Sequence, residues 1–325
     1  MKTIIFFNNK GGVGKTTLVY HFAYMLSELG YKTLAVDLDP QANLTTMFLD
    51  EDRLIKIYEN EDTRQTILNS IKPLTKGIGD ISEAIIETIN DNLYLIPGDL
   101  ELSIFEDRLS DNWNKCLNKD ELAFRITSSF YRIIQNAAFT HHFDYTLIDV
   151  GPNLGAINRA TFISADYIVV PMAADLFSLQ GLKNLGSAIS RWKEEWNDRY
   201  SRNPEPELKL PKGSAKPIGY IVMQHVATEG KPVFAYKKWA DKIPLIFRKS
   251  VLVDNNTESV NLEGDQYCIA LIKHYRSLMA MAQEARKPIF LLKPADGAIG
   301  AHFNAVKEVY KDFNKLTDNI IKKCL

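Results

Sequence analysis

The chain has 325 residues, of which 46% are hydrophobic and 24% are charged, a composition typical of a globular protein and not of a disordered tail. Its 39 basic and 40 acidic residues leave a net charge of −1, which excludes a polybasic arm extending over the whole chain. Cys116, Cys268 and Cys324 form no CxxC pair and no disulfide framework, so a reducing compartment, the cytoplasm, is predicted. We expect neither a signal peptide nor a membrane span, because no apolar run reaches about 18 residues.

Short apolar runs alternate with helical patterns along the chain. The run from Thr3 to Phe7 predicts a buried strand, Asn8 to Gly14 form a glycine-rich turn, and the apolar spacing from Thr16 to Leu29 predicts a helix. Further strands are predicted at residues 32–37, 93–96, 145–149, 167–170, 218–223 and 289–292. Strands that are apolar on both faces and alternate with helices indicate an α/β fold, with a mostly parallel twisted sheet flanked by helices on both faces.

The rest of the chain is predicted to belong to the same domain, residues 1–325, because no linker separates two cores. Polar decorations are expected at about residues 50–90 and 194–217, and the second of these is rich in proline, which indicates a surface connection. Residues 100–140 are predicted to form helices and loops along one edge of the sheet. Residues 303–325 predict a C-terminal helix with one apolar face, formed by Phe303, Val306, Tyr310, Phe313, Leu316 and Ile320.

The turn after the first strand has the residues and spacing of a phosphate-binding loop. It reads Lys10-Gly11-Gly12-Val13-Gly14-Lys15-Thr16-Thr17. Its glycines let successive backbone N–H groups converge on phosphate oxygens, and the start of the helix adds the positive end of its dipole. The Lys15 side chain is predicted to reach the β- and γ-phosphates, and the Thr16 hydroxyl to ligate Mg²⁺. The alternative, an incidental glycine-rich turn, does not explain why a strand precedes the loop and a helix follows it.

The nucleotide is predicted to be ATP. Guanine recognition would require an NKxD motif after a late strand, and the nearest match, Asn118-Lys119-Asp120-Glu121, has the wrong last residue and no apolar strand before it.

These motifs resemble one family, the ParA/MinD-type P-loop ATPases with a deviant Walker A motif, written KGGxGK followed by Ser or Thr. Residues 10–16 match that motif at every fixed position. Residues 36–45 resemble the family's second motif, and residues 147–152 are similar to its Walker B segment. Two later blocks, residues 171–182 and 281–289, resemble the ParA branch in particular, so that the matching blocks extend from about residue 1 to 292.

The resemblance implies roles for single residues. Lys10 is then the signature lysine, which crosses a dimer interface to the phosphates of the opposite subunit, Asp39 orients the attacking water, and Asp149 holds Mg²⁺ through water. The residues themselves agree with this, because Asp39 and Asp149 each follow a predicted strand, where a carboxylate faces the ligand crevice; capping of a loop is the alternative. Lys10, Lys15 and Asp39 are thus the catalytic candidates, with ATP and Mg²⁺ as cofactors. Where relatives contact adenine, this chain has Met223-Gln224-His225, and no base contact is assigned.

Basic residues gather in one segment of the chain. Residues 209–250 contain nine basic and two acidic residues, a net charge of +7, so that the remainder carries −8. Tyr236 and Trp239 interleave with the lysines, as aromatic residues do on many nucleic-acid-binding surfaces. In the resembled family, ATP-bound dimers bind DNA nonspecifically through basic residues of the C-terminal half. The candidate DNA-binding residues are Lys237, Lys238, Arg248 and Lys249; a solvated helix face is the alternative.

The resemblance therefore implies a Mg²⁺-dependent ATPase that forms an ATP-bound sandwich homodimer. It would partition or position DNA, a plasmid or a chromosome, together with a ParB-like or other adaptor protein, in the cytoplasm and associated with the nucleoid. One alternative is a membrane-associated positioning ATPase of the MinD kind, but the acidic residues Glu308, Asp312 and Asp318 favour a C-terminal helix that packs on the domain. Another alternative is a P-loop ATPase subunit of a defence or signalling complex, which would dock through residues 53–89 and 194–217.

Overall fold

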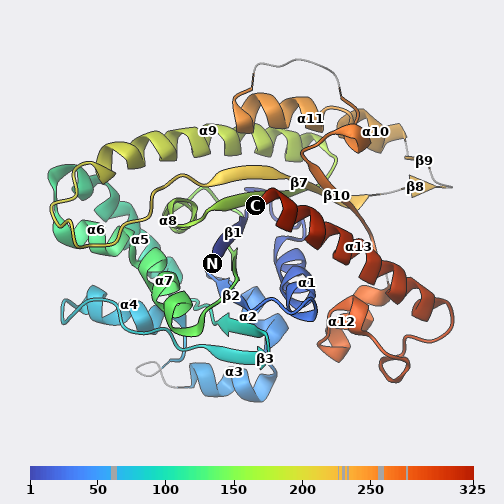
Figure 1. Cartoon of the computed structure of the whole chain (residues 1–325), viewed down its shortest axis with the longest axis horizontal. Coiled ribbons are helices and arrows are strands. Elements are labelled where there is room, and N and C mark those ends of the chain that lie inside the picture. Colours follow the sequence, from blue (N-terminus) through green and yellow to red (C-terminus); the bar gives the residue numbers. More distant parts are fainter. Residues whose placement is uncertain (60–63, 226, 229–230, 233, 255–259, 276) are drawn as a thin grey trace.

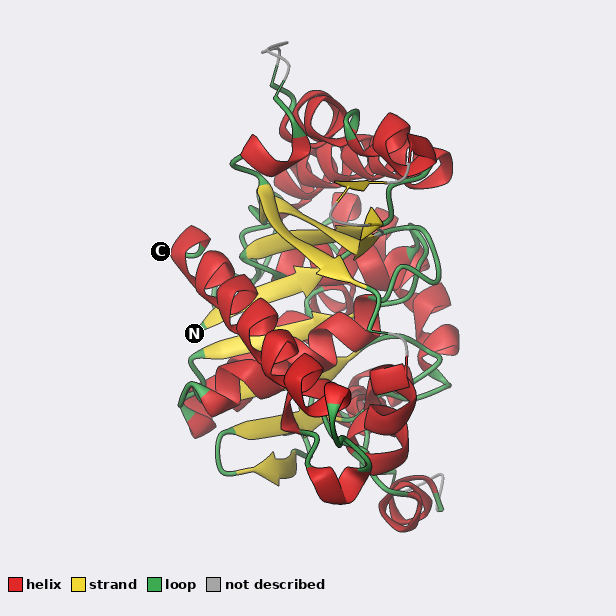
Figure 2. Ribbon diagram, turned by 90° about the vertical axis from the view of Figure 1, so that its right-hand side faces the viewer, coloured by secondary structure: helices red, strands yellow, loops and turns green. Residues whose placement is uncertain are grey.

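A twisted sheet forms the middle layer of the molecule, and helices pack on both of its faces (Figures 1 and 2). The computed structural model describes residues 1–59, 64–225, 227–228, 231–232, 234–254, 260–275 and 277–325. Within them the sheet has eight strands, in the order β10-β7-β6-β1-β5-β2-β4-β3. The strands are β1 (Lys2–Phe6), β2 (Thr33–Asp37), β3 (Glu87–Asn90), β4 (Leu93–Ile96), β5 (Tyr145–Asp149), β6 (Tyr167–Met172), β7 (Lys216–His225) and β10 (Cys268–Lys273). These neighbours are parallel except β3 and β4, so the predicted fold class is confirmed.

The helices divide between the two faces of the sheet. One face carries α4 (Ile67–Lys76), α5 (Leu102–Lys115), α6 (Glu121–Thr127), α7 (Ser129–His141), α8 (Ala156–Ser164), α9 (Leu176–Tyr200) and α11 (Ile243–Ile246). The other face carries α1 (Lys15–Glu28), α2 (Asn43–Phe48), α3 (Glu51–Tyr58), α12 (Ser277–Ala285) and α13 (Ala301–Lys323). Helix α10 (Phe234–Ala240) and a π-helical turn, Phe247–Leu252, flank α11, and a short ribbon pairs β8 (Ala227–Thr228) with β9 (Lys231–Pro232).

Each face of the sheet has its own apolar core, and β1 shows how one strand serves both. Successive side chains of a strand point to opposite faces. Ile5 accordingly lies in the core with Trp192 of α9, whereas Ile4 and Phe6 lie in the core with Phe313 of α13. All of these side chains are buried. A strand buried on both faces explains why β1 reads as an unbroken apolar run.

The structure differs from the sequence prediction in several places. Residues 194–200 of the predicted polar connection belong to helix α9, in which Trp196 is fully buried. The apolar run at residues 289–292 is a 3₁₀ turn, Ile289–Leu291, and not a strand. Strands β3 and β10, which occupy the two edges of the sheet, were not predicted. Residues 100–140 do not decorate an edge, because helices α5, α6 and α7 cover a face of the sheet with buried aromatic side chains such as Phe105 and Phe130.

Helix α13 lies across the second face of the sheet and ends near β10 (Figure 2). Val306, Phe313, Leu316 and Ile320 of the predicted apolar face are buried, whereas Phe303 and Tyr310 are exposed. No helix in the described part of the chain is both long and apolar enough to cross a membrane.

Candidate nucleotide-binding site

The candidate site lies at the carboxyl ends of the central strands, where three loops meet. Strand β5 lies between β1 and β2, and the register pairs Phe6 of β1 and Asp37 of β2 with the same residue, Asp149 of β5. The loops that follow these strands therefore start from one edge of the sheet, which is where ligands bind in open α/β folds. The phosphate loop, Asp39 and Asp149, which are far apart in sequence, are thereby brought together.

The phosphate loop has the backbone that its glycines predict. Gly12 and Gly14 have φ angles of 71° and 80°, a left-handed conformation that side chains other than glycine rarely adopt. Helix α1 begins directly after Gly14, at Lys15. The loop is fixed at its base by Asn8, whose side-chain amide donates to the Pro171 carbonyl at 2.7 Å and whose side-chain oxygen accepts from the Lys10 N–H at 3.0 Å.

Lys15 is buried under this loop, with only 6% of the residue exposed. Its ammonium lies 3.5 Å from the Lys10 carbonyl oxygen. Burial lowers the pKa of Lys15, and the negative charges of Asp149 and Asp39 oppose that shift. The ammonium therefore lies inside the loop and within the field of both carboxylates, as a phosphate-binding lysine should.

Asp149 is the most unusual charged group of the site. It is fully buried, and within the described residues neither of its carboxylate oxygens has a hydrogen-bond partner. Burial raises the pKa of Asp149 to about 8, the charge of Asp37 adds to that shift, and the Thr16 hydroxyl and Lys15 oppose it. A buried carboxylate without a partner is costly, so a bound cation is expected to compensate its charge. Together with the Thr16 hydroxyl, the Asp149 oxygens supply the oxygen ligands that Mg²⁺ prefers, so the residues present fit the ion.

Asp37 is a residue of the site to which the sequence analysis assigned no role. Its carboxylate accepts from the Thr45 N–H at 2.9 Å, from the Thr45 hydroxyl at 2.7 Å and from the Asp39 N–H at 3.2 Å. Burial raises the pKa of Asp37 to about 6, against the hydrogen bonds from Thr45. Asp37 thus fixes the start of the loop that carries Asp39. The only signal for it in the sequence was its position at the end of an apolar strand, two residues before Asp39.

Asp39 lies against the loop that follows β5. A Cβ atom added to Gly151 would lie 3.3 Å from Asp39 Oδ1, so a side chain at position 151 would crowd this carboxylate. The same oxygen accepts from the Gln41 N–H at 3.0 Å, and 7% of Asp39 is exposed. Asp39 therefore lies on the same edge as Asp149 and is nearly as deeply buried.

Lys10 is held by its own chain. Its ammonium donates to Asp175 Oδ2 at 2.5 Å and to the Ser178 hydroxyl at 3.3 Å. Asp175 also caps α9, because its other oxygen accepts from the Ser178 N–H at 2.9 Å. Burial raises the pKa of Asp175, but the hydrogen bonds from Lys10 and Ser178 outweigh it and leave that pKa below its usual value. About a third of each side chain of the Lys10–Asp175 pair is exposed, so the pair lies at the mouth of the site.

A cavity of about 120 Å³ lies beside the phosphate loop. It is bounded by Gly14 and Thr17 of the loop, by Met223 of β7, and by His274 and Tyr275, which follow β10. Met223 was among the residues that the sequence analysis considered near the base. His274 and Tyr275 were not, because β10, which positions them, was not predicted as a strand.

The comparisons with known proteins agree with this geometry. A family model described as an AAA domain matches residues 1–201. The curated relatives include an uncharacterized protein of Methanocaldococcus jannaschii, 33% identical over 210 residues that cover 65% of this chain and 71% of that protein. They also include the chromosome-partitioning ATPase Soj of Treponema pallidum, 28% identical over 200 residues that cover 62% and 68%.

Solved structures share the fold over the whole chain. A protein from Corynebacterium diphtheriae has a TM-score of 0.71 at 23% identity, covering 100% of this chain and 99% of that one. A variant of Cyanothece McdA in complex with ATP has a TM-score of 0.65 at 17% identity, covering 98% and 96%. The chain belongs to the ParA/MinD-type P-loop ATPases. The resemblance inferred from the sequence motifs is therefore confirmed.

The basic segment of this ParA/MinD-type chain is partly exposed and partly buried. Lys237, Lys238 and Lys249 are exposed, as is Lys242. The ammonium groups of Lys238 and Lys242 lie over the Trp239 ring, 5.0 and 5.1 Å from its centroid. The acidic residue Glu229 of this segment lies outside the described residues.

The prediction that Arg248 is a DNA-binding residue is wrong. It is buried, and its guanidinium donates to Asp265 Oδ1 at 2.7 Å, while the Tyr220 hydroxyl donates to Asp265 Oδ2, also at 2.7 Å. Arg248 therefore ties the π-helical turn to the sheet and is not available at the surface for DNA.

Proposed function

We propose that this chain hydrolyses MgATP in an ATP-bound sandwich homodimer and thereby partitions or positions DNA with the help of an adaptor protein. The observation that carries the nucleotide part is Asp149, a fully buried carboxylate without a hydrogen-bond partner in the described residues, next to a phosphate loop. The DNA part draws support from the names of relatives, such as Soj and the chromosome partitioning protein ParA of Caulobacter vibrioides.

Each residue of the site has a separate role in phosphoryl transfer. Backbone N–H groups of residues 10–17 bind the phosphate oxygens, and the buried Lys15 ammonium neutralises their charge. Thr16 and Asp149 would hold Mg²⁺, which supplies further neutralisation of the phosphate charge. Asp39, on the same edge of the sheet, would orient the attacking water. Asp37 keeps Asp39 in place through the Asp39 N–H.

The dimer part of the proposal concerns Lys10. Charge on the γ-phosphate oxygens develops in the transition state, and a lysine supplied by the partner subunit would make hydrolysis depend on dimerisation. In this structure the Lys10 ammonium is bound to Asp175 of its own chain, so dimerisation would require that ion pair to open. The pair is partly exposed, and an exposed ion pair costs only about 1 kcal/mol or less to break.

The alternatives are less well supported. A MinD-like membrane anchor would need the apolar face of the C-terminal helix, and four residues of that face are buried on the sheet: Val306, Phe313, Leu316 and Ile320. No contact in the described residues favours a subunit of a defence or signalling complex over a partition ATPase. The exposed lysines of α10 favour DNA as the scaffold, with the protein in the cytoplasm and at the nucleoid.

The experiment that tests the proposal separates ATP binding from hydrolysis. The Asp39→Ala variant should bind MgATP and form a dimer with normal affinity but lose turnover by about 100-fold or more, because only water positioning is removed. Asp91→Ala, at an exposed turn between β3 and β4, is the matched control. Turnover at the normal rate in Asp39→Ala would remove Asp39 from the mechanism.

Mixing two inactive proteins tests the role of Lys10 in trans. Lys10→Ala and Asp39→Ala subunits are each expected to be inactive alone. In a mixed dimer one site has both its own Asp39 and a partner Lys10, so turnover should reappear. If the mixture remains inactive while the two proteins form heterodimers, Lys10 does not act across the interface.

A further inference from the structure

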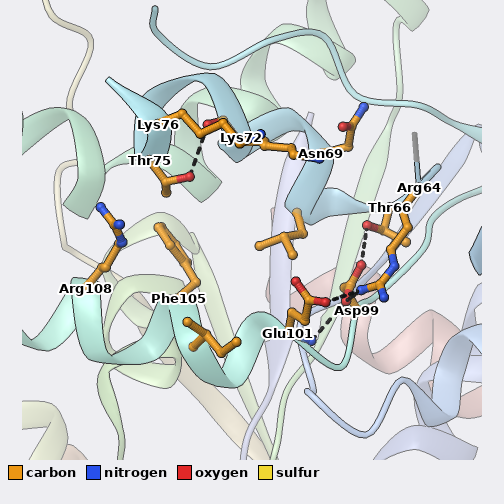
Figure 3. Close-up of a pocket in the computed structure, with 12 residues that line it drawn as sticks. Arg64, Thr66, Asn69, Lys72, Thr75, Lys76, Asp99, Glu101, Phe105 and Arg108 are labelled. Carbon is orange, nitrogen blue, oxygen red and sulfur yellow. Dashed lines mark hydrogen bonds and ion pairs between the residues drawn. The ribbon is translucent and has the colours of Figure 1, made fainter. Parts of the chain in front are cut away.

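A groove of about 230 Å³ lies between α4 and α5, away from the phosphate loop (Figure 3). Helix α4 forms one wall, and the start of α5 with the preceding residues forms the other. In the sheet, β4, which leads into α5, is separated from β1 and its phosphate loop by β2 and β5. The groove is therefore distinct from the nucleotide site.

The two ends of the groove differ in charge. At one end Arg64 donates to Asp99 at 3.1 Å and to Glu101 at 2.8 Å, so the acidic residues there are already paired (Figure 3). At the other end Lys76 and Arg108 lie with Thr75 and Lys72. Lys76 and Arg108 are exposed, and within the described residues their side chains make no ion pair. Among the described residues that line the groove, none at this end is acidic, so the lining there is positively charged.

The middle of the groove is apolar. Leu68 of α4 and Phe105 of α5 line it, and Phe105 is anchored in the core by an edge-to-face contact with Phe130, with ring centroids 5.6 Å apart. Ile104 lines it too, and 63% of this residue is exposed. A site for a plain anion needs only the cations, whereas an exposed isoleucine on the α5 wall also offers a contact for an apolar side chain.

We infer that this groove binds an acidic peptide segment of a partner protein, with an apolar side chain against Ile104 and Phe105 and a carboxylate against Lys76 and Arg108. Clusters of cationic side chains recognise acidic motifs in this way. The apolar contact would supply affinity, and the charges would select acidic partners and exclude basic ones.

The groove is connected to the nucleotide site by a continuous chain of contacts. Asp99, in the wall of the groove, follows Gly98, whose N–H donates to the Thr45 hydroxyl at 2.9 Å. That hydroxyl donates to Asp37, which in turn holds the Asp39 N–H. Ile104 and Phe105 belong to α5, and the Leu102 N–H at the start of this helix donates to the Asp99 carbonyl at 3.1 Å. A peptide that shifts the start of α5 would therefore shift Asp39 through Asp99. This second half of the inference, control of turnover, rests on the proposed function, whereas the binding does not.

The binding test uses a fluorescein-labelled peptide in which two leucines are flanked by glutamates, measured by fluorescence anisotropy on the full-length protein. The Lys76→Glu/Arg108→Glu variant should bind about tenfold more weakly, because two attractions become repulsions. Ile104→Ser should weaken binding several-fold and leave the fold intact, since the side chain is exposed. Lys115→Glu, an exposed lysine further along α5, is the matched control and should bind normally.

Companion probes decide what kind of ligand the groove takes. A peptide with glycines in place of the leucines, one with lysines in place of the glutamates, inorganic phosphate and duplex DNA should all bind more weakly than the acidic leucine peptide. Equal binding of phosphate, or of the glycine peptide, would mean a plain anion site and overturn the inference. The inference would also be overturned if duplex DNA bound equally well and this binding were lost in Lys76→Glu/Arg108→Glu. It would likewise be overturned if the acidic leucine peptide did not bind.

The connection to Asp39 is tested by NMR, and ATP turnover is measured separately. On titration with the acidic leucine peptide, the backbone amide resonances of Thr45 and Asp39 should shift in the wild-type protein and remain unchanged in Lys76→Glu/Arg108→Glu. If the peptide binds but these amides do not move, the coupling is wrong and the binding surface stands. If the amides move but the protein has no ATPase activity, the proposed function fails and the inferred groove does not.

Discussion

The nucleotide site and the basic segment both concentrate charge, but they hold it in opposite ways. Asp37 and Asp149 are fully buried and Lys15 nearly so, at the ends of central strands. Lys237, Lys238 and Lys249 are exposed on short elements at the edge of the molecule, next to α9 (Figure 1). A buried charge is costly unless a partner compensates it, so a buried charge without a partner indicates a ligand. An exposed charge carries no such information, because water already solvates it.

The largest expected effect concerns Lys15. Lys15→Ala should weaken MgATP binding by about 1000-fold, because truncating a buried charged partner costs several kcal/mol. Lys237→Ala, which removes an exposed charge of the same kind, should leave nucleotide affinity unchanged. Isothermal titration of the folded variants with MgATP measures both. Normal affinity in a folded Lys15→Ala protein would contradict the assignment of the phosphate loop.

Arg248 is buried, unlike the exposed lysines of the basic segment, and its effect on stability can be compared with that of Lys249. Arg248→Met should lower the free energy of unfolding by about 3 kcal/mol, because Asp265 would remain buried with the Tyr220 hydroxyl as its only side-chain donor in the described part of the chain. Lys249→Met, at the neighbouring exposed position, should change it by less than about 0.5 kcal/mol. Urea denaturation of both variants gives the two values. Similar stability of the two proteins would mean that the Arg248–Asp265 pair does not hold the π-helical turn.

Arg248 also shows what the sequence could not reveal. Its partner Asp265 is 17 residues away, and nothing in the local pattern of basic residues distinguishes it from Lys249. The phosphate loop and the ends of β2 and β5 were predictable, because each follows an apolar run that is buried on both faces. The role of Asp37 was not, since its partner Thr45 lies in the next helix.

The edges of the sheet were less predictable than its centre, again for physical reasons. Strand β10 was missed although Cys268 to Ile272 form an apolar run in the sequence. Only Ile269 and Ile272 of this run are buried, because the strand lies at an edge of the sheet. The run at residues 289–292 is apolar but too short for periodicity to separate a strand from a buried turn. In the structure this run forms a 3₁₀ turn, and the Ile289 N–H donates to His21 Nε2 at 3.1 Å.

His21 links that turn to the phosphate-loop helix, and it should make the protein sensitive to acid. Its Nε2 accepts from Ile289, so Nδ1 carries the proton and donates to the Thr17 carbonyl at 2.8 Å. Burial lowers the pKa of His21 to about 4. The neutral form is therefore favoured on folding, and its contribution is present above the unfolded pKa of about 6.5 and is lost as the pH falls towards 4.

The contribution of His21 to the free energy of unfolding is expected to fall by about 2 kcal/mol between about pH 7 and pH 5. Urea midpoints of the wild-type protein and of His21→Phe over this range measure it, and His302→Phe, a surface histidine near the start of α13, is the matched control. The raised pKa values of Asp149 and Asp37 act in the opposite direction, but they are common to all three proteins. The wild-type protein and His302→Phe should therefore change in parallel, while His21→Phe, although less stable at pH 7, should gain about 2 kcal/mol relative to them by pH 5. A parallel change in all three proteins would exclude His21 as the source.

The smallest expected effect concerns the exposed lysines, and it tests whether their exposure has a function. Lys237→Glu/Lys238→Glu should weaken binding of duplex DNA about tenfold or more in the presence of ATP, similarly on all sequences, because lysines that contact phosphates position the protein but do not read bases. Each lysine on a phosphate contributes about 0.9 to the slope of log affinity against log salt, so losing two in each subunit of a dimer should reduce that slope by about 3 to 4. Gel shifts over a range of salt, with ATP and with ADP, measure both quantities, and Lys115→Glu on α5 is the control.

Equal binding with ATP and ADP would mean that dimerisation does not build the DNA surface. Unchanged binding by the double variant would mean that these lysines are exposed only because water solvates them.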